Sequence, residues 1–262
     1  MKKTIRTLAA FASAAILLSA CGGGGSDVAK ELGLQNPLIH FVHALPGGPN
    51  VDFLVNGSVL QPNIPYKQVT NFANINTGNT NVAYASTGTT TALASGNFPD
   101  VAKGHEYTVL ALPALTGGDI GLIDDPFDKG LLSNSARVRA FNATVNAQNL
   151  DMYVVAPGTD ISNISPTMAG VNYKNAVPAS GQDSLYLNGG NYVVIATAAG
   201  SKTPIYQSPT ISINNNADWL ITTVPIAGTL SQLAPGQIHI LVAQGGNTSQ
   251  PGVEYNNALT NQ

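Results

Sequence analysis

The chain is poor in charged and aromatic residues, which make up 10% and 6% of its 262 residues. It contains no dense group of Lys and Arg, so nucleic acid is not an expected partner. Its single cysteine excludes an intrachain disulfide and a metal site built from cysteines. Low charge combined with abundant Gly, Pro, Thr, Asn and Val is typical of a folded, turn-rich all-β protein rather than a disordered chain.

One stretch occurs twice along the chain. Leu38–Val55 recurs without a gap at Arg137–Val154, 99 residues later, with four identical residue pairs that include Asp52 and Asp151. Further matches follow at an offset of 112, so the second copy carries 13 additional residues in loops between Val154 and Leu187. Each copy reads as a strand, a turn and a second strand. A repeat of this length predicts two similar structural units.

The N-terminus has the pattern of a bacterial lipoprotein signal. A short basic region containing Lys2, Lys3 and Arg6 precedes the apolar run Leu8–Leu18, which is too short for a membrane-spanning helix. Leu18-Ser19-Ala20-Cys21 then resembles a lipobox, whose cysteine is acylated and becomes the first mature residue. We therefore predict a signal peptide at residues 1–20, lipidation at Cys21 and a Gly/Ser-rich tether at 21–36. Because Gly22 is not Asp, the sorting rule of enteric bacteria points to the outer membrane.

Candidate strands follow one another about every ten residues, separated by Gly, Pro or Asn, and no long helical period interrupts them. This pattern predicts an all-β fold of two tandem antiparallel sandwiches, at residues 37–131 and 132–244. We interpret the acidic stretch from Asp124 to Asn134 as a solvated linker that proteases should cut into two resistant pieces. Residues 245–262 have the composition of a C-terminal tail.

The first copy also resembles a known family. His43-Ala44-Leu45-Pro46, followed by Val51-Asp52-Phe53-Leu54-Val55-Asn56-Gly57, is similar to the opening motif of the domain-of-unknown-function family 4397. Leu45 stands where Ser is usual, and the second copy departs further, with Asn142 in place of the histidine and Val145 in place of the proline. The resemblance implies two immunoglobulin-like sandwiches and an envelope location, and it implies no established activity.

The repeated polar residues are predicted to be structural. His43 and Asn142 occupy equivalent positions on the apolar faces of their strands, where a polar group requires a hydrogen-bond partner. We expect each to fasten its own turn, at Pro46–Pro49 and Val145–Gln148. Asp52 and Asp151 recur at the same point of a hairpin, which also favours a structural role. Tyr107 and Trp219 are expected in the cores, although an exposed aromatic platform for glycan is the alternative.

No catalytic residue, metal ligand or cofactor is predicted. His40 and His43 should point to opposite faces of a strand, and no local motif of a hydrolase, metalloprotease or phosphate-binding loop occurs. A weak Ca²⁺ site at Asp119, Asp124, Asp125 and Asp128 is an alternative to the solvated linker, although Pro126 interrupts the ligand spacing. Two functions stay open: a non-enzymatic envelope module that binds a protein or glycan, and an enzyme or ligand-binding protein acting on envelope carbohydrate or peptide.

Overall fold

The computed structural model describes residues 32–115, 117–127, 133–147, 149–226, 237–245 and 250–261. The predicted signal peptide, the lipidation site Cys21 and most of the predicted tether lie outside these residues. Within the described residues no helix is long and apolar enough to cross a membrane. The described chain is built from strands and one short 3-10 helix, which confirms the prediction of an all-β fold.

The strands form two sets, which we call the first half (residues 37–127) and the second half (residues 133–245). The first half contains β1 Leu38–His43, β2 Val51–Val55, β3 Ser58–Ile64, β4 Gln68–Val69, β5 Ala73–Asn74, β6 Gly78–Ser86, β7 Ala92–Val101, β8 His105–Pro113 and β9 Gly118–Pro126. The second half contains β10 Ala136–Asn142, β11 Leu150–Val155, β12 Met168–Val171, β13 Ala176–Val177, β14 Leu185–Leu187, β15 Gly190–Ala198, β16 Pro204–Gln207, β17 Ile211–Ile213, β18 Asp218–Pro225 and β19 Ile238–Gln244.

The two halves share strand order and register. In the first half, β4 and β5 pair with one edge of β1, β8 pairs with its other edge, and β9 pairs with β8. Strands β3, β2, β6 and β7 form a second sheet. The second half places β13 and β14 beside β10, followed by β18 and β19, over a sheet that contains β12, β11, β15 and β16. The pair Leu38↔Glu106 recurs as Arg137↔Asp218, at the offsets of 99 and 112 seen in the sequence.

One strand pair in each half runs parallel, a feature that the antiparallel expectation did not include. These pairs are β1 with β8 and β10 with β18, and every other named pair is antiparallel. Parallel neighbours require a long crossover connection. Here the chain between them passes through the second sheet of the same half, so each parallel pair follows from the sandwich topology.

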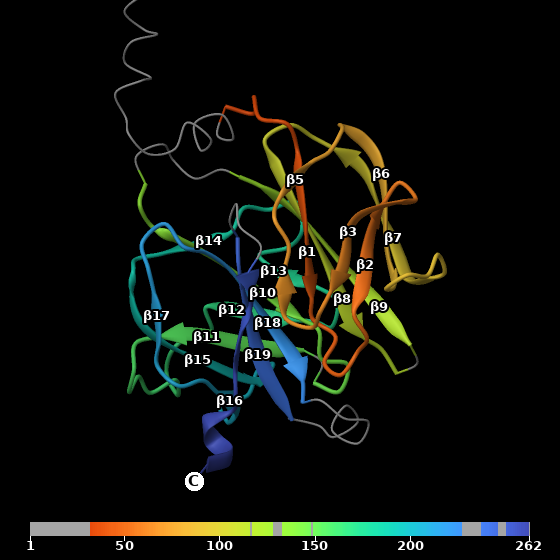
Figure 1. Ribbon diagram of the computed structural model, residues 1–262. Coiled ribbons are helices and arrows are strands. Elements are labelled where there is room, and N and C mark those ends of the chain that lie inside the picture. Colours follow the sequence, from red (N-terminus) through yellow and green to blue (C-terminus); the bar gives the residue numbers. More distant parts are fainter. Residues whose placement is uncertain are drawn as a thin grey trace, which may run out of the picture.

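Four sheets pack as successive layers (Figure 1). The cores within the two halves contain Phe41, Phe53 and Tyr84 in the first half, and Ala140 and Met152 in the second. A third core lies between the two central sheets and joins the halves; we call it the interface core. It consists of Val42, Ala44, Val69, Leu110, Leu112, Ile123, Phe141, Ala143, Ala176, Val224, Leu241 and Ala243.

The interface core explains why the central strands are buried on both faces. Every residue of β1 and β10 is buried, as expected for strands covered by other layers on both sides. Gly121 of β9 provides space for the ring of Phe141 of β10, because a Cβ atom there would lie 2.5 Å from Phe141 Cζ. The halves therefore pack directly against each other.

Part of the predicted linker belongs to the fold. Asp124 and Asp125 lie in β9, and the side chain of Asp125 is only 13% exposed because Arg137 and Arg139 pair with it. The Asp124 carbonyl accepts a 2.8 Å hydrogen bond from the Gly181 amide of the second half. The interpretation of these two residues as a solvated linker was wrong, since the second half covers the outer edge of β9. Residues 128–132 lie outside the described residues.

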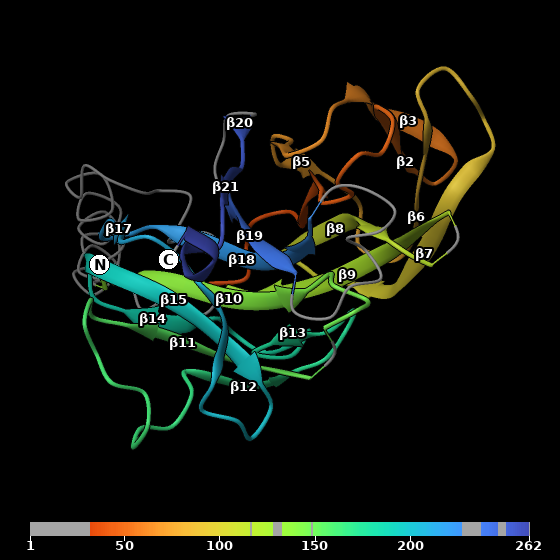
Figure 2. The same ribbon diagram turned by 90° about the horizontal axis from the view of Figure 1, so that it is seen from below.

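The predicted C-terminal tail also takes part in the fold. Residues 250–261, which we call the C-terminal segment, contain β20 Gln250–Pro251, β21 Val253–Tyr255 and the 3-10 helix η2 Ala258–Asn261. Strand β20 pairs with β4 of the first half, and β21 pairs with β19 of the second. Figure 2 shows these two short strands running from the side of β5 towards the C-terminus. The segment therefore connects both halves.

Candidate functional site

The predicted turn anchors His43 and Asn142 are both fully buried. His43 Nε2 lies 2.9 Å from the Pro49 carbonyl, to which it donates, and His43 Nδ1 lies 3.4 Å from the Leu45 amide. Burial lowers the pKa of His43, although the Pro49 hydrogen bond opposes this effect. The structure thus places His43 against the turn for which it was predicted.

Asn142 makes a larger set of hydrogen bonds in the second half. Its amide Nδ2 donates to the Ala147 carbonyl at 2.9 Å and to the Val171 carbonyl at 3.1 Å. Its Oδ1 accepts from the Thr144 amide and the Thr223 hydroxyl, each at 2.8 Å. All polar atoms of this side chain are therefore used by the surrounding backbone and one hydroxyl.

Asp52 of β2 joins strand β3 to the turn between β6 and β7. Its carboxylate accepts hydrogen bonds from the Asn63 amide at 2.7 Å and the Gly88 amide at 3.0 Å, and these bonds lower its pKa. The Asn63 backbone adopts a positive φ of 55°. Such a conformation is uncommon for a residue with a side chain, and the hydrogen bond to Asp52 supports it.

Asp151 repeats this arrangement in the second half. It accepts from the Gly170 and Gly200 amides, both at 2.8 Å. Gly200 is the counterpart of Gly88 at the offset of 112, and Gly170 has a positive φ like Asn63. In each half the aspartate thus joins the next strand, β3 or β12, to the turn that follows β6 or β15.

Replacing His43 in the full-length chain should separate a structural role from a metal-binding one. We expect His43→Leu to lower the free energy of unfolding by about 1–3 kcal/mol, because the Pro49 carbonyl loses its buried donor. His43→Asn, which copies the second half, should be milder. Urea unfolding measures both variants. A neutral or stabilising effect of His43→Leu, or a Zn²⁺-dependent rise in melting temperature seen only in the wild type, would contradict the structural role.

A group of buried charges, which the sequence did not predict, lies where the two halves meet. We call Arg137, Arg139, Asp125, Asp183 and Asp218 the charged cluster. The Arg137 guanidinium contacts Asp125 at 2.7 Å and both Asp183 and Asp218 at 2.9 Å, and Phe127 lies 4.5 Å from it. Burial lowers the pKa of Arg137, but the three carboxylates outweigh burial and raise it above the usual range.

Arg139 binds mainly to backbone oxygens. Its guanidinium donates to the carbonyls of Pro178 at 2.6 Å, Ala179 at 2.9 Å and Gln182 at 2.5 Å, and it lies 3.2 Å from Asp125. Burial raises the pKa of Asp125, and the two arginines oppose this effect. The two arginines alternate with Val138 and Ala140 along β10. This alternation was the one pattern in the sequence that indicated polar residues on the face of β10 opposite to its apolar face.

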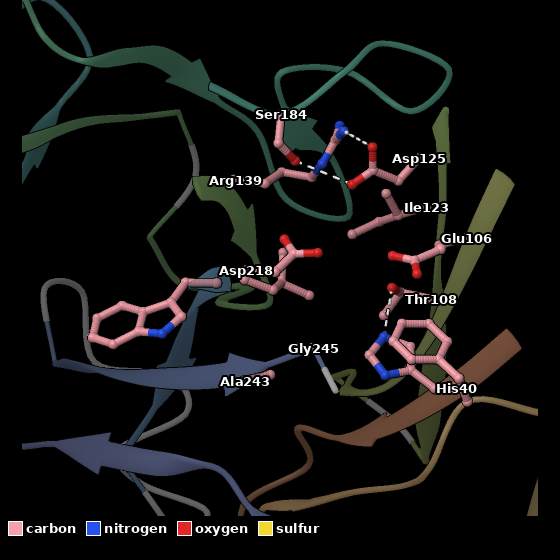
Figure 3. A pocket seen from close by; sticks show the side chains of 13 residues that line it. His40, Glu106, Thr108, Ile123, Asp125, Arg139, Ser184, Asp218, Ala243 and Gly245 are labelled. Atoms are coloured by element: carbon pink, nitrogen blue, oxygen red, sulfur yellow. Dashed lines mark hydrogen bonds and ion pairs between the residues drawn. The ribbon is translucent and has the colours of Figure 1, made fainter. Parts of the chain in front are cut away.

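A small, partly open cavity of about 40 Å³ lies beside the charged cluster, between the two central sheets. Figure 3 shows the carboxylates of Glu106 and Asp218 pointing into it and Asp125 bonded to Arg139 and Ser184. His40 Nε2 lies 2.8 Å from Thr108 Oγ1. Burial lowers the pKa of His40 to about 4, so its imidazole is neutral at neutral pH.

The cavity can hold water molecules but not an organic ligand. A water molecule requires at least about 10–15 Å³ of such volume, whereas small-molecule pockets measure about 300–1,000 Å³. The described residues contain no group of three or more His, Cys, Asp or Glu side chains arranged to hold a metal ion. Asp128, a member of the alternative Ca²⁺ site, lies outside the described residues.

The other two histidines, and the aromatic residues predicted to lie in the cores, also have partners within the fold. His105 Nδ1 lies 2.7 Å from Asp124 Oδ1, and His239 Nδ1 lies 2.8 Å from Glu254 Oε1. Tyr107 and Trp219 are buried in the cores of the first and second halves. The structure therefore places these two aromatic residues in the cores and not on an exposed platform.

Together, the fold and the buried cluster define a four-layered all-β protein whose two similar halves are joined by a shared core and a group of ion pairs. Residues 37–153 match the model of a family described as Domain of unknown function (DUF4397). This segment covers β1–β10 and most of β11, and the match supports the family resemblance of the first copy. A comparison with curated proteins found no match.

Proposed function

We propose that the protein is a non-enzymatic lipoprotein of the cell envelope, anchored through Cys21. In this proposal the two joined halves form one rigid unit that acts at the membrane surface as a binding or structural module. The structural observation that carries this proposal is the joining of the two halves. The interface core and the pairs of Asp125 with Arg137 and Arg139 use buried apolar and charged side chains to hold both halves together. In this proposal the second half is a diverged copy of the family domain.

The predicted lipid anchor is compatible with a folded unit that acts at the membrane surface. Two or more acyl chains at Cys21, each contributing about 0.8 kcal/mol per buried methylene, hold a protein durably on a membrane. The Gly/Ser-rich residues that follow Cys21 supply a flexible connection to the folded part. Gly22 favours the outer membrane, and the partner expected there is an envelope protein or glycan.

Lipidation is tested by expressing the full gene beside a Cys21→Ser variant and fractionating the cells. We expect the wild type in the membrane fraction, with an acylated N-terminal peptide visible by mass spectrometry, and the variant outside that fraction. Retention of the variant on the membrane, together with an unmodified Cys21 in the wild type, would show that the anchor is not lipid.

A binding function is distinguished from an enzymatic one with the soluble form that begins at Gly22. This form is applied to arrays of envelope glycans and proteins, and the same panel is then assayed for turnover. Saturable binding without product formation supports a binding module. Release of a cleaved sugar or peptide would contradict the proposal and establish the enzymatic alternative.

A further inference from the structure

The second half carries an insertion that covers the outer face of its outer sheet. The chain passes directly from β2 to β3 through Asn56 and Gly57, whereas residues 156–167 separate β11 from β12. Ile161 and Ile164 of this insertion pack against Tyr153, Val193 and Ile195. The equivalent positions in the first half are Leu54, Asn81 and Ala83, at the offsets of the repeat.

The insertion forms one wall of an open hollow on the surface of the second half, which we call the outer hollow. Its volume is about 370 Å³. The insertion contributes Ser162, Asn163 and Ser165, and the turn between β15 and β16 contributes Ser201 and Lys202. The volume lies within the range of small-molecule pockets, in contrast to the small cavity between the halves.

Hydrogen bonds within the protein hold Lys202 in place. Its ammonium group donates to the Tyr153 hydroxyl at 2.9 Å and to the Ile164 carbonyl, and it lies 5.0 Å from the Tyr153 ring. An ammonium group has three donors, so one remains for a bound molecule. The Ser201 hydroxyl oxygen accepts from the Thr203 amide at 3.1 Å, which leaves its own proton for donation.

The outer hollow also supplies acceptors and carries balanced charge. Ser162 Oγ donates its proton to Asp160 Oδ1 at 2.6 Å. The lone pairs of this oxygen can then accept a hydrogen bond from a bound molecule. Asp151 also lines the hollow, and its negative charge balances the positive charge of Lys202. Both carboxylate oxygens of Asp151 accept hydrogen bonds from backbone amides. Ile164 and Pro166 add apolar surface. A bound molecule must therefore offer both donors and acceptors, and it gains nothing from net charge.

We propose that the outer hollow binds a neutral sugar unit of an envelope glycan. Each sugar hydroxyl can both donate and accept a hydrogen bond, which matches the mixed lining, and the C–H face of the ring suits Ile164 and Pro166. This inference rests on the proposed binding function and names its ligand class. It places the binding site in the second half alone. The first half also has an open hollow, of about 420 Å³, at Asn81, Ala83 and Ser95, but no charged residue lines it, whereas Lys202 lines the outer hollow.

The test uses the soluble chain from Gly22 and measures binding by isothermal titration and by NMR of labelled protein. The probes are glucose, galactose, N-acetylglucosamine and their short oligomers, with glucuronic acid and glucosamine as charged counterparts. We expect a neutral probe to bind and to shift the resonances of residues 162–166 and 201–202. Lys202→Met should weaken this binding about tenfold, and Ser201→Trp should abolish it by filling the hollow.

Matched variants in the first half provide the controls. Lys103→Met removes an exposed lysine, and Thr89→Trp changes the counterpart of Ser201, so both should bind like the wild type. Unchanged melting temperatures would show that the variants fold. The inference is overturned if no neutral sugar binds, if Lys202→Met and Ser201→Trp leave binding unchanged, or if a charged sugar is the preferred occupant. Binding of an envelope protein elsewhere would then leave the proposed function intact, whereas turnover of any probe would contradict that function itself.

Discussion

Replacing Arg137 with methionine should lower the free energy of unfolding by about 3–5 kcal/mol, the usual effect of removing one partner from a buried ion pair. For a chain of this size, the loss corresponds to a fall in melting temperature of roughly 10 °C. The reason is that Asp125, Asp183 and Asp218 would lose their shared guanidinium while the fold still partly shields them from water. Thermal and urea unfolding of the full-length soluble chain measure this effect.

Two further variants show whether the effect belongs to the charged cluster. Asp183→Asn should have a smaller effect, because Arg137 keeps Asp125 and Asp218 and the Asp183 side chain is 21% exposed. Lys103→Met, which removes an exposed positive charge, should change stability by less than about 0.5 kcal/mol. An Arg137→Met variant as stable as the wild type would mean that the cluster does not stabilise the contact between the halves.

The sequence predicted the strands and the repeat well, because both depend on local patterns. Alternating apolar residues and turn residues identified β1, β2 and their counterparts β10 and β11. The equivalent positions of His43 and Asn142 also followed from the repeat, and the structure shows each beside its own turn. These features require no knowledge of what packs on the outer face of a sheet.

The contact between the halves could not be predicted in the same way. In a single sandwich, Arg137 and Arg139 would face water, and nothing in the local sequence shows that another sheet covers them. Their burial depends on the first half, whose Asp125 was itself interpreted as part of a linker. The charged cluster therefore arises from long-range packing, and so does the cavity beside it.

The C-terminal segment was missed for a related reason. Its strands β20 and β21 contain only two and three residues, too few for an alternating pattern to be recognised. They are strands because β4 and β19 offer open edges to pair with. The outer hollow likewise depends on how an insertion folds back over β11 and β15, and its sequence alone reads as a polar loop.

Ending the chain after residue 249 should destabilise the whole protein, because the C-terminal segment contacts both halves. Gly252 donates from its amide to the Lys67 carbonyl at 2.7 Å, and Asn257 bonds to the backbone of Ile205 and Gln207. Glu254 pairs with Lys67 at 2.6 Å and with His239 at 2.8 Å. At about 1 kcal/mol for each of these five contacts, the loss should reach about 5 kcal/mol, measured by urea unfolding.

Truncation should also promote association of the protein. It exposes the edges of β4 and β19, and unpaired strand edges pair readily with other chains. Gly252→Val should reproduce part of the effect without shortening the chain, since a Cβ atom there would lie 2.9 Å from Leu241 Cδ1 and 3.1 Å from the Val242 carbonyl. Val253→Thr, at a position 52% exposed, is the matched control and should be nearly neutral. A truncated chain that stays monomeric and unfolds like the wild type would show that the C-terminal segment does not hold the two halves together.

The acid dependence of stability gives an independent measure of the same segment. The hydrogen bond from His239, followed by the pairing with Lys67, lowers the pKa of Glu254 from 4.5 to about 2, although burial opposes this change. A carboxylate whose pKa is lower in the folded state stabilises the fold above its unfolded pKa. That stabilisation is lost as the pH falls from about 4.5 towards 2. Glu254→Gln should therefore be less stable than the wild type at pH 6 and should approach it near pH 2. A difference between the two proteins that stays constant over this range would mean that the ion pairs of Glu254 do not hold the C-terminal segment to the two halves.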